Sequence, residues 1–289
     1  MAFELILNTV IPVFLIILAG FLVGRFRKVN VQPFVDFLVY LTGPSLIFTS
    51  MVKSDVELSD FWVIVGVASA VVLLLLLLSY LFFRKLRKPG LHLPIAWGNT
   101  GYMGYPIALF AFGTAGLSRA ILFDVVNSFF LYSIGIFIVH HRNNVKEIFK
   151  VPLIYAVVLG FVFSMLRIPI PKAIFTPLET IGLITIPLAL MVLGYRLREI
   201  KLTSLKVAVL ASLLRVVGGF FIAFLIVSLL SISGLVRNIV LLEAAMPSAV
   251  MSMILTAKYK RDAGLTASVV LVSTVLSILS IPLILWFVA

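Results

Sequence analysis

One short stretch decides how this chain folds: Trp97-Gly98-Asn99-Thr100-Gly101-Tyr102-Met103-Gly104-Tyr105-Pro106. It combines three glycines, an asparagine and a proline within the apolar segment 91–113. Glycine and proline both destabilise a helix interior. At membrane depth, backbone can leave the helical hydrogen-bond ladder only where protein or enclosed water satisfies its polar groups. The stretch therefore predicts either an interrupted membrane helix that borders a site, or a kinked helix whose glycines allow close packing.

The composition of the whole chain indicates that its solvent is lipid. Of 289 residues, 62% are hydrophobic and 12% are charged, and the mean hydropathy is +1.23. A soluble domain keeps about a quarter of its residues charged, which hydrates its surface. The lower share found here leaves too little polar surface to cover a protein in water. We therefore expect an all-α polytopic membrane protein embedded in the lipid bilayer.

Apolar segments long enough to cross a membrane recur along the chain, since about 20 helical residues span the hydrocarbon core. The first segment is followed by basic residues rather than preceded by them, which is the reverse of a secretory signal peptide. We expect it to be a retained helix with its N-terminus outside. Ten transmembrane helices are predicted, at residues 5–24, 33–52, 61–83, 91–113, 117–139, 151–167, 174–195, 204–232, 237–257 and 265–288.

The net charge of +12 invites a nucleic-acid partner, but the position of the charges argues against one. Most of the 23 Lys and Arg residues lie in alternate connections, at 25–28, 84–88, 140–150, 196–206 and 258–261. Cytoplasmic loops of membrane proteins carry such an excess. The pattern supports ten spans in the inner (plasma) membrane with both termini outside. The opposite connections hold only Lys53, Arg119, Arg167, Lys172 and Arg237.

The two halves of the chain carry similar motifs in the same order. Since each half holds five spans, an odd number, the second must enter the membrane from the opposite side. We predict a 5+5 inverted repeat, residues 1–145 and 146–289, and such repeats exchange outward-open and inward-open states in transporters. The matching motifs are Pro33-Phe34-Val35-Asp36 and Pro44-Ser45-Leu46 with Pro177-Leu178-Glu179 and Pro187-Leu188-Ala189, Gly104-Tyr105-Pro106 with Ala245-Met246-Pro247, and Ala115-Gly116-Leu117-Ser118 with Ala263-Gly264-Leu265-Thr266.

Equivalent interruptions in two repeats point to a transporter's substrate site. Pro247 in the ninth span matches Pro106 in the fourth, so both helices are expected to break and cross at mid-membrane. Half-helix N-termini carry partial positive charge and free N–H groups, which suit carboxylates. We therefore expect a small organic anion as substrate. The predicted substrate-binding residues are Asn99, Thr100, Tyr102, Tyr105, Pro106, Asn127, Pro247 and Ser248.

These motifs carry a family resemblance. The stretch 98–106, the stretch 243–250 (Glu-Ala-Ala-Met-Pro-Ser-Ala-Val) and the stretch 187–194 (Pro-Leu-Ala-Leu-Met-Val-Leu-Gly) resemble the auxin efflux carrier family, which includes plant auxin exporters and bacterial malate and malonate carriers. The resemblance runs from end to end. It implies an inverted-repeat fold like that of bile-acid symporters and sodium/proton antiporters, with broken crossover helices 4 and 9. It further implies that Asn99 and the backbone near Pro106 and Pro247 line the site.

The resemblance also implies two bodies within the fold. Helices 1, 2, 6 and 7 would form a scaffold that mediates homodimerisation, and helices 3–5 and 8–10 would form a transport unit. Two departures limit the likeness to the plant exporters. First, only His140 to Lys150 stands where those proteins have a long hydrophilic loop, so control by phosphorylation there is not expected. Second, the third span holds no buried acid to match the one in the plant exporters.

Several polar residues within the predicted spans have two possible roles each. Asn99 could contact the substrate or cap the second half-helix of the fourth span. Asp124 and Asn127 share one face of the fifth span, either in the cavity or in a contact between helices. Tyr102 and Tyr105 could bind an organic substrate or simply pack.

The charged residues within the predicted spans also have alternative roles. Glu243 is a candidate proton or sodium site, as is Asp124. Alternatively Glu243 is a structural partner, which neutralises the facing helix dipole or pairs with a buried cation such as Arg215. Arg215 itself could attract the anion, pair with Glu243 or extend to the cytoplasmic interface. Asp36 and Glu179 are expected to complement helix N-termini rather than bind substrate.

The favoured function is a secondary active transporter of an auxin-like monocarboxylate or a dicarboxylate. The alternative is a cation/proton antiporter or sodium-coupled symporter of the same fold. An enzyme is not expected, because no catalytic cluster is present, nor is a nucleotide-binding loop that would couple ATP. With no cysteine, and with His92, His140 and His141 outside any ligand spacing, neither a metal nor another cofactor is expected.

Overall fold

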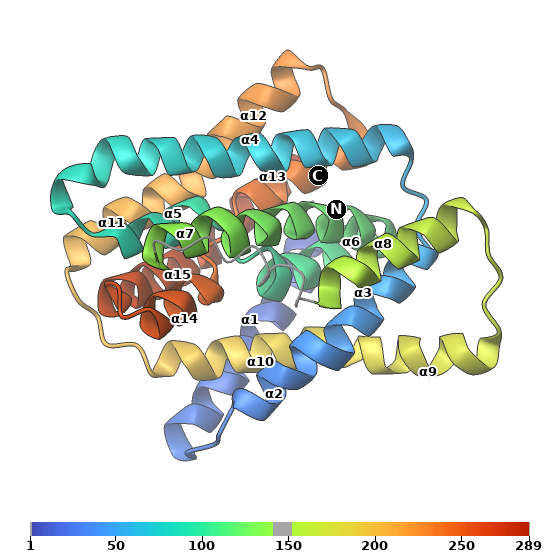
Figure 1. Ribbon diagram of the computed structural model, residues 1–289, viewed down its shortest axis with the longest axis horizontal. Coiled ribbons are helices and arrows are strands. Elements are labelled where there is room, and N and C mark those ends of the chain that lie inside the picture. The colour runs from blue at the N-terminus through green and yellow to red at the C-terminus, as the bar shows by residue number, and fades with distance from the viewer. Residues whose placement is uncertain (1, 141–151, 289) are drawn as a thin grey trace.

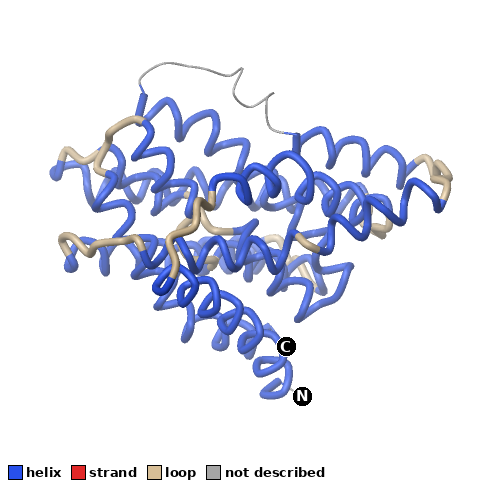
Figure 2. Tube along the Cα trace, turned by 90° about the horizontal axis from the view of Figure 1, so that it is seen from below, coloured by secondary structure: helices blue, strands red, loops and turns tan. Residues whose placement is uncertain are grey.

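The computed structural model describes residues 2–140 and 152–288, and this part of the chain is almost entirely helical (Figure 2). Four short π-helical segments, 38–42, 100–104, 131–135 and 214–218, widen the long helices locally. Apart from one isolated bridge, the described residues form no β structure. The α-helices are α1 Ala2–Phe26, α2 Gln32–Phe37, α3 Gly43–Val52, α4 Leu58–Phe83, α5 His92–Ala96, α6 Tyr105–Phe130, α7 Ile136–His140, α8 Pro152–Met165, α9 Lys172–Leu183, α10 Thr185–Arg198, α11 Leu205–Leu213, α12 Gly219–Leu229, α13 Gly234–Ala244, α14 Val250–Lys258 and α15 Ala263–Val288.

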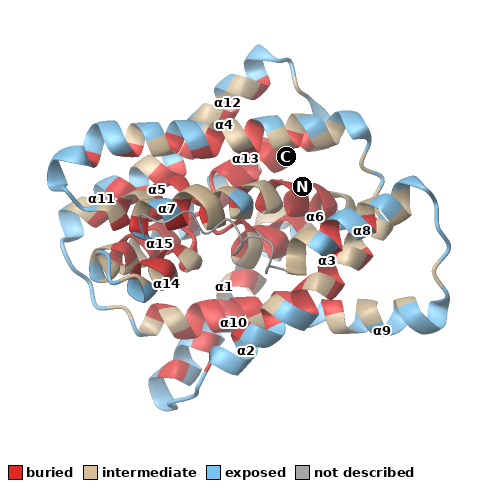
Figure 3. Cartoon of the chain, in the orientation of Figure 1, coloured by how far each residue is buried: buried red, intermediate tan, exposed pale blue. Residues whose placement is uncertain are grey.

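Seven described helices are long and apolar enough to cross a membrane, and Pro152–Met165 is a shorter apolar helix. Large apolar side chains face outward on many of them, for example Leu229 at 81% exposure and Leu279 at 70% (Figure 3). Apolar surface on this scale marks contact with lipid or protein. The chain is a multi-pass membrane protein, as its composition predicts. The seven helices are Phe3–Phe26, Gln32–Val52, Leu58–Leu86, Thr100–His140, Lys172–Arg198, Leu205–Leu229 and Ala263–Val288.

The helix that runs from Thr100 to His140 contains a sharp bend at Gly113. This residue has φ 67° and ψ −162°, a conformation that is open to glycine but strained for other residues. The bend falls where the sequence separates the fourth and fifth spans. Helix also covers the other predicted spans, but 91–113 and 237–257 are interrupted and the helix in 151–167 is short. A crossing at these three ranges stays a prediction.

Several pairs of helices pack closely. Helix α1 lies along α10, and α3 lies against α8 and α9. Helices α4 and α13 pack on α6, α11 and α14 pack on α15, and α1 also contacts α6 and α15. Figure 1 shows α4 along one edge of the molecule and α9 with α10 along the other. Buried residues fill the region between these helices, and α10 itself is largely buried (Figure 3).

The two chain ends lie side by side in both Figure 1 and Figure 2, where the start of α1 approaches the end of α15. Figure 1 also separates the connections into two ends. The α4–α5 and α10–α11 connections lie at the left, and the α3–α4 and α8–α9 connections lie at the right. The left-hand connections are the basic ones. Of the other basic connections, residues 141–150 lie outside the described residues.

Two expectations about surface acids are wrong. Neither Asp36 nor Glu179 lies in the first turn of its helix, where it would complement the N-terminus. Asp36 instead accepts a 2.9 Å hydrogen bond from Gln32 Nε2. Glu179, in the second half of α9, forms an ion pair with Lys53 at the end of α3. Each acid thus has a side-chain partner, a neutral amide for Asp36 and a cation for Glu179.

Candidate functional site

The fourth predicted span is interrupted in the middle of the structure. Helix α5 ends at Ala96, and Trp97 adopts an extended conformation with φ −108° and ψ 122°. Helical structure resumes at Thr100 as a π-helical turn that leads into α6, after Asn99 at φ −83° and ψ 55°. The glycine- and asparagine-rich stretch is therefore an interruption, as predicted, and not only a kink.

The ninth predicted span is interrupted in the same manner. Helix α13 ends at Ala244, and Ala245 has φ −96° and ψ 4°. Helix α14 begins at Val250, after Ala249 in an extended conformation with φ −62° and ψ 130°. Pro247 lies in this gap and has no N–H to continue the ladder.

The two interruptions cross and satisfy each other's backbone. The Asn99 N–H donates to the Pro247 carbonyl at 2.6 Å, and the Ala249 N–H donates to the Trp97 carbonyl at 2.9 Å. Gly98 and Ser248 form the antiparallel bridge between these bonds. Protein thus supplies hydrogen-bond partners for both stretches of non-helical backbone, which is the condition for such backbone to be tolerated at membrane depth.

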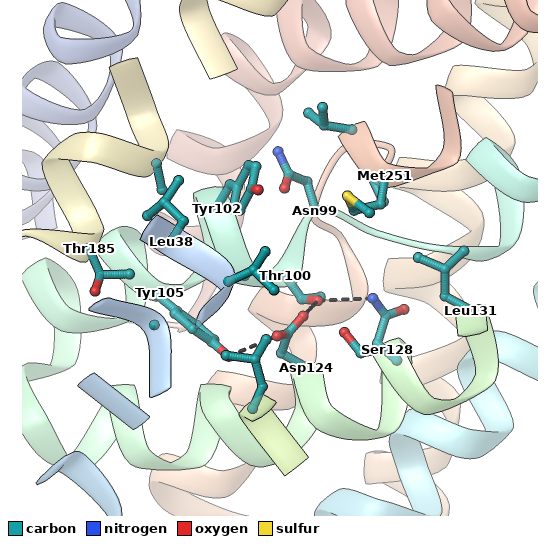
Figure 4. A pocket seen from close by; sticks show the side chains of 18 of the residues that line it. Leu38, Asn99, Thr100, Tyr102, Tyr105, Asp124, Ser128, Leu131, Thr185 and Met251 are labelled. Carbon is teal, nitrogen blue, oxygen red and sulfur yellow. Dashed lines mark hydrogen bonds between the residues drawn. The ribbon is translucent and has the colours of Figure 1, made fainter. Parts of the chain in front are cut away.

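A cavity of about 100 Å³ lies against this crossing (Figure 4). A buried water needs about 10–15 Å³, so the cavity has room for several waters or a small organic molecule. Both half-helices that follow the interruptions present their first residues to it. The lining residues are Leu38, Val39, Gly43, Ile47, Gly98, Asn99, Thr100, Gly101, Tyr102, Tyr105, Asp124, Asn127, Ser128, Leu131, Tyr132, Leu153, Thr185, Ile186, Ala189, Ala249, Val250 and Met251.

Asp124 is the one charged side chain among the residues that line the cavity, and it is 8% exposed. The Thr100 hydroxyl donates to its Oδ1, and the Tyr105 hydroxyl donates to its Oδ2 at 2.7 Å. Asn127 Nδ2 donates to Thr100 Oγ1 and to the Gly98 carbonyl, both at 3.0 Å. Figure 4 shows the side chains of Thr100, Tyr105 and Asp124 converging at the start of the second half-helix. Asp124 thus lines the cavity and also contacts the neighbouring half-helix, as both interpretations expect.

The Asn99 side chain does not cap the half-helix, so that reading is wrong. No side-chain hydrogen bond caps this N-terminus, and the buried Nδ2 of Asn99 has no partner within the described part of the chain. The Asn99 carbonyl instead accepts from the N–H groups of Met103 at 3.2 Å and Gly104 at 3.1 Å. The side-chain amide remains as an unpaired donor in the cavity wall.

Three of the predicted substrate-binding residues stand behind the cavity wall. Pro106 lies in the first turn of α6, and Pro247 contributes the carbonyl that pairs with Asn99. Ser248 is fully buried and donates to the Pro94 carbonyl at 2.6 Å. Pro247 and Ser248 thus form part of the crossing itself.

Glu243 is fully buried in the last turn of α13, four residues before Pro247, and it does not line the cavity. Its two carboxyl oxygens lie against Gly104 and have no hydrogen-bond partner among the described residues. An unpaired buried carboxylate is costly, and the uncharged carboxylic acid avoids that cost. The expected ion pair with Arg215 is absent from the described structure, so this reading of Glu243 is wrong.

The hypothesis that the Arg215 side chain extends to the cytoplasmic membrane interface is also wrong. Arg215 is 1% exposed and lies in the π-helical segment between α11 and α12. Its guanidinium donates to the carbonyls of Ala96 at 2.9 Å and Met246 at 3.2 Å, and also to that of Ala244. Arg215 is thus directed to the ends of both interrupted helices.

Comparison with known proteins places the chain among transporters. A sequence profile described as "Membrane transport protein" matches residues 5–148 and 142–285. The chain belongs to this membrane transport family. The resemblance to auxin efflux carriers is thereby confirmed, and the protein is a transporter and not an enzyme.

Two archaeal members of this family are similar over nearly their whole length. An uncharacterized transporter of Methanocaldococcus jannaschii is 29% identical over 298 aligned residues, which cover 96% of this chain and 97% of the relative. An uncharacterized transporter of Methanothermobacter thermautotrophicus is 29% identical over 291 residues, which cover 96% of each chain. Their names specify no substrate, so the chemistry of the site has to be argued from its residues.

Sequence reasoning did not find one side of this transporter's cavity. That side comes from α3, α8 and α10 and their neighbours, and most of its residues are apolar. Apolar positions in a membrane helix look the same whether they face lipid, protein or a cavity. Thr185, beside Pro187 in the seventh span, is the one polar residue on that side.

No metal site was found in the described part of this transporter, where no three His, Cys, Asp or Glu residues cluster. His92 is engaged with Ser79, whose Oγ lies 2.6 Å from His92 Nδ1. His140 stacks on the Tyr259 ring, and His141 lies outside the described residues.

Proposed function

We propose that the protein is a secondary active transporter of a small organic anion, bound at the crossing of the two interrupted helices. One observation carries the proposal: the N-termini of both second half-helices, at Thr100 and Val250, line the same cavity. The first N–H groups of a helix have no intrahelical partner, and its dipole is positive there. Two such ends at one cavity favour an anion.

The polarity of the cavity supports a carboxylate in particular. The residues that line it include no Lys or Arg, so an anion would be held by partial charges and hydrogen bonds. Asn99 Nδ2 is an unpaired donor in the wall, and Tyr102 adds an aromatic ring and a hydroxyl. This combination suits an auxin-like monocarboxylate or a small dicarboxylate.

The architecture required for alternating access is part of the same proposal. Besides the seven long helices, we propose crossings by the interrupted helices α5/α6 and α13/α14 and by α8, which gives ten spans in a 5+5 inverted repeat. The packing of α1 on α10 and of α3 on α8 and α9 supports a scaffold of helices 1, 2, 6 and 7. We expect this scaffold to form the homodimer, and the remaining helices to carry the substrate.

The cavity extends from the crossing toward the basic end of the molecule. Leu38 follows the basic segment 25–28, and Tyr132 lies two turns before His140, so both lie toward the proposed cytoplasmic side. At the other end, Arg119 donates to Asp60 at 2.7 Å and Asp55 at 3.0 Å, and Ser118 donates to the Ser50 carbonyl at 3.2 Å. These contacts join α6 to α3, to α4 and to the connection between them at the proposed outer end, which supports an inward-facing state.

Asp124 is the best-placed residue for coupling to a proton. Its carboxylate occupies the N-terminus of the first of the two half-helices, and it would repel an anionic substrate in the same cavity. A protonated Asp124 removes this repulsion, so proton and anion would bind together. Glu243 is a second carboxyl beside the crossing, although it lies outside the cavity wall.

These two acids favour one alternative function, a cation/proton antiporter or sodium-coupled symporter of the same fold. The test is thermal unfolding of the purified protein with malonate, malate, acetate or indole-3-acetate, with and without sodium and at two pH values. Sulfate serves as the inorganic anion control. Stabilisation by an organic carboxylate that Asn99→Ala removes, and that Asn8→Ala on the exposed face of α1 retains, supports the proposal. If only cations or pH shift the unfolding temperature, the alternative replaces it.

A further inference from the structure

The first half-helices bring a cluster of carbonyl oxygens to the crossing. Helix α5 ends at Ala96 and α13 ends at Ala244, and the last carbonyls of a helix have no intrahelical partner. Both helix dipoles are negative at these ends. The carbonyls of Ile95, Ala96, Ala244 and Met246 therefore form an electronegative site, and none of the four residues lines the cavity.

The Arg215 guanidinium fills this site. Nη1 donates to Ala96 at 2.9 Å and to Ile95 at 3.5 Å, Nε donates to Met246 at 3.2 Å, and Nη2 donates to Ala244. One side chain from a third helix thus contacts both interrupted helices. Among the described residues, Arg215 has no carboxylate partner, so backbone carbonyls alone neutralise its charge.

Carbonyls at interrupted helix ends are also the ligands that coordinate sodium in transporters built from broken helices. We propose that Arg215 is a tethered cation in the cation site of this crossing, and that the protein consequently needs no sodium to hold the crossing or to transport. This inference rests on the proposed function, and it concerns the coupling ion rather than the substrate. It argues against the sodium-coupled alternative.

An arginine side chain is well suited to fill this carbonyl site permanently. Its guanidinium stays charged in proteins and offers five N–H donors in a fixed plane. A lysine ammonium has three donors and cannot reach four carbonyls in this geometry. A proton or a sodium ion would enter and leave with the transport cycle, whereas a side chain cannot.

Thermal unfolding of purified variants tests the proposal without any substrate. We expect the unfolding temperature of the wild type to be the same in sodium, potassium and N-methylglucamine chloride at equal ionic strength. Arg215→Ala should unfold at lower temperature, and millimolar guanidinium or sodium should restore part of the loss in a saturable manner. Arg237→Ala is the control, since Arg237 donates only to its neighbour Asn238 in the described structure, and no salt should rescue it.

A second variant covers the case in which Arg215→Ala does not fold. Arg215→Lys keeps a tethered cation, so it should unfold at a lower temperature that sodium does not raise. Saturable stabilisation of the wild type or of Arg215→Lys by sodium would overturn the proposal. So would an Arg215→Ala protein that folds but responds to neither guanidinium nor sodium. Because these measurements use no organic anion, the carboxylate hypothesis can fail independently.

Discussion

The backbone N–H of Asn99 lies 2.6 Å from the carbonyl oxygen of Pro247, and this bond joins the interrupted helices of the two halves of the chain. The bond uses the Asn99 backbone and leaves its side-chain amide unpaired at the cavity. The same residue therefore holds the crossing with one group and offers a donor to a ligand with another. These two roles can be separated by mutation.

Asn99→Ala should leave the fold intact and weaken binding of the carboxylate substrate. The alanine keeps the backbone bond to Pro247, whereas the ligand loses a hydrogen bond to a charged group, which contributes about 1.5–3 kcal/mol. We expect roughly tenfold to hundredfold weaker binding. Titration of the substrate against intrinsic fluorescence or unfolding temperature measures the change. Unaltered affinity would show that Asn99 does not contact the ligand.

Asp124→Asn should remove the pH dependence of substrate binding. In the wild type the anion meets a carboxylate in the cavity, so binding should strengthen as pH falls and Asp124 takes up a proton. Linkage of one proton limits this effect to about tenfold per pH unit. Asparagine is neutral at every pH, so its affinity should stay near the low-pH value of the wild type. Binding measured across a pH series decides the matter.

Glu243→Gln provides the comparison for Asp124→Asn. Glu243 is buried outside the cavity wall, so its neutralisation should leave the pH dependence of binding in place. If Glu243→Gln abolishes that dependence while Asp124→Asn retains it, Glu243 is the proton site and the assignment to Asp124 is wrong.

Gly104→Ala should destabilise the protein, because an added Cβ would collide with both carboxyl oxygens of Glu243. Overpacking a core typically costs about 1–3 kcal/mol. The matched control is Gly66→Ala in α4, where an added Cβ meets nothing within 4 Å. Alanine is favoured over glycine within helices, so this control should be neutral or slightly stabilising. Thermal unfolding in detergent compares the two variants.

A double-mutant cycle separates steric from electrostatic causes at this position. Glu243→Ala removes the colliding atoms, so Gly104→Ala should cost less in that background. Glu243→Gln keeps the size of the side chain and should give no relief. An equal cost of Gly104→Ala in all three backgrounds would contradict the observed contact.

The sequence was most informative where residue type restricts the backbone. Gly98, Asn99 and Pro247 oppose continuous helix, and both interruptions occur where these residues stand. Gly113 separates the fourth and fifth spans for the same reason, since its positive φ suits glycine. Hydropathy located the long helices because about 20 apolar residues have few alternatives to a membrane helix.

Side-chain destinations were less predictable, because they depend on contacts between distant segments. Arg215 reaches carbonyls of residues 96 and 246, and a buried arginine alone does not reveal whether it will meet a carboxylate, lipid headgroups or backbone. Apolar residues such as Leu38 and Ala189 could not be recognised from the sequence as lining the cavity, because an apolar helix position is compatible with lipid, protein or a cavity as its neighbour. The inverted repeat and its boundaries remain predictions.

The absence of cysteine from the chain makes the proposed orientation directly testable. Ser128 lines the cavity near the middle of the fifth predicted span, and we propose that the cavity opens to the cytoplasm. Ser128→Cys should therefore react with a membrane-impermeant maleimide in inside-out vesicles and be protected in right-side-out vesicles. Lys201→Cys and Glu57→Cys, in exposed connections on the proposed inner and outer sides, calibrate the two preparations. A carboxylate substrate should slow labelling of Ser128→Cys but not of Lys201→Cys. Labelling of Ser128→Cys only from the side that exposes Glu57→Cys would mean that the cavity opens outward. Labelling of Glu57→Cys in inside-out vesicles and of Lys201→Cys in right-side-out vesicles would mean that the proposed topology is reversed.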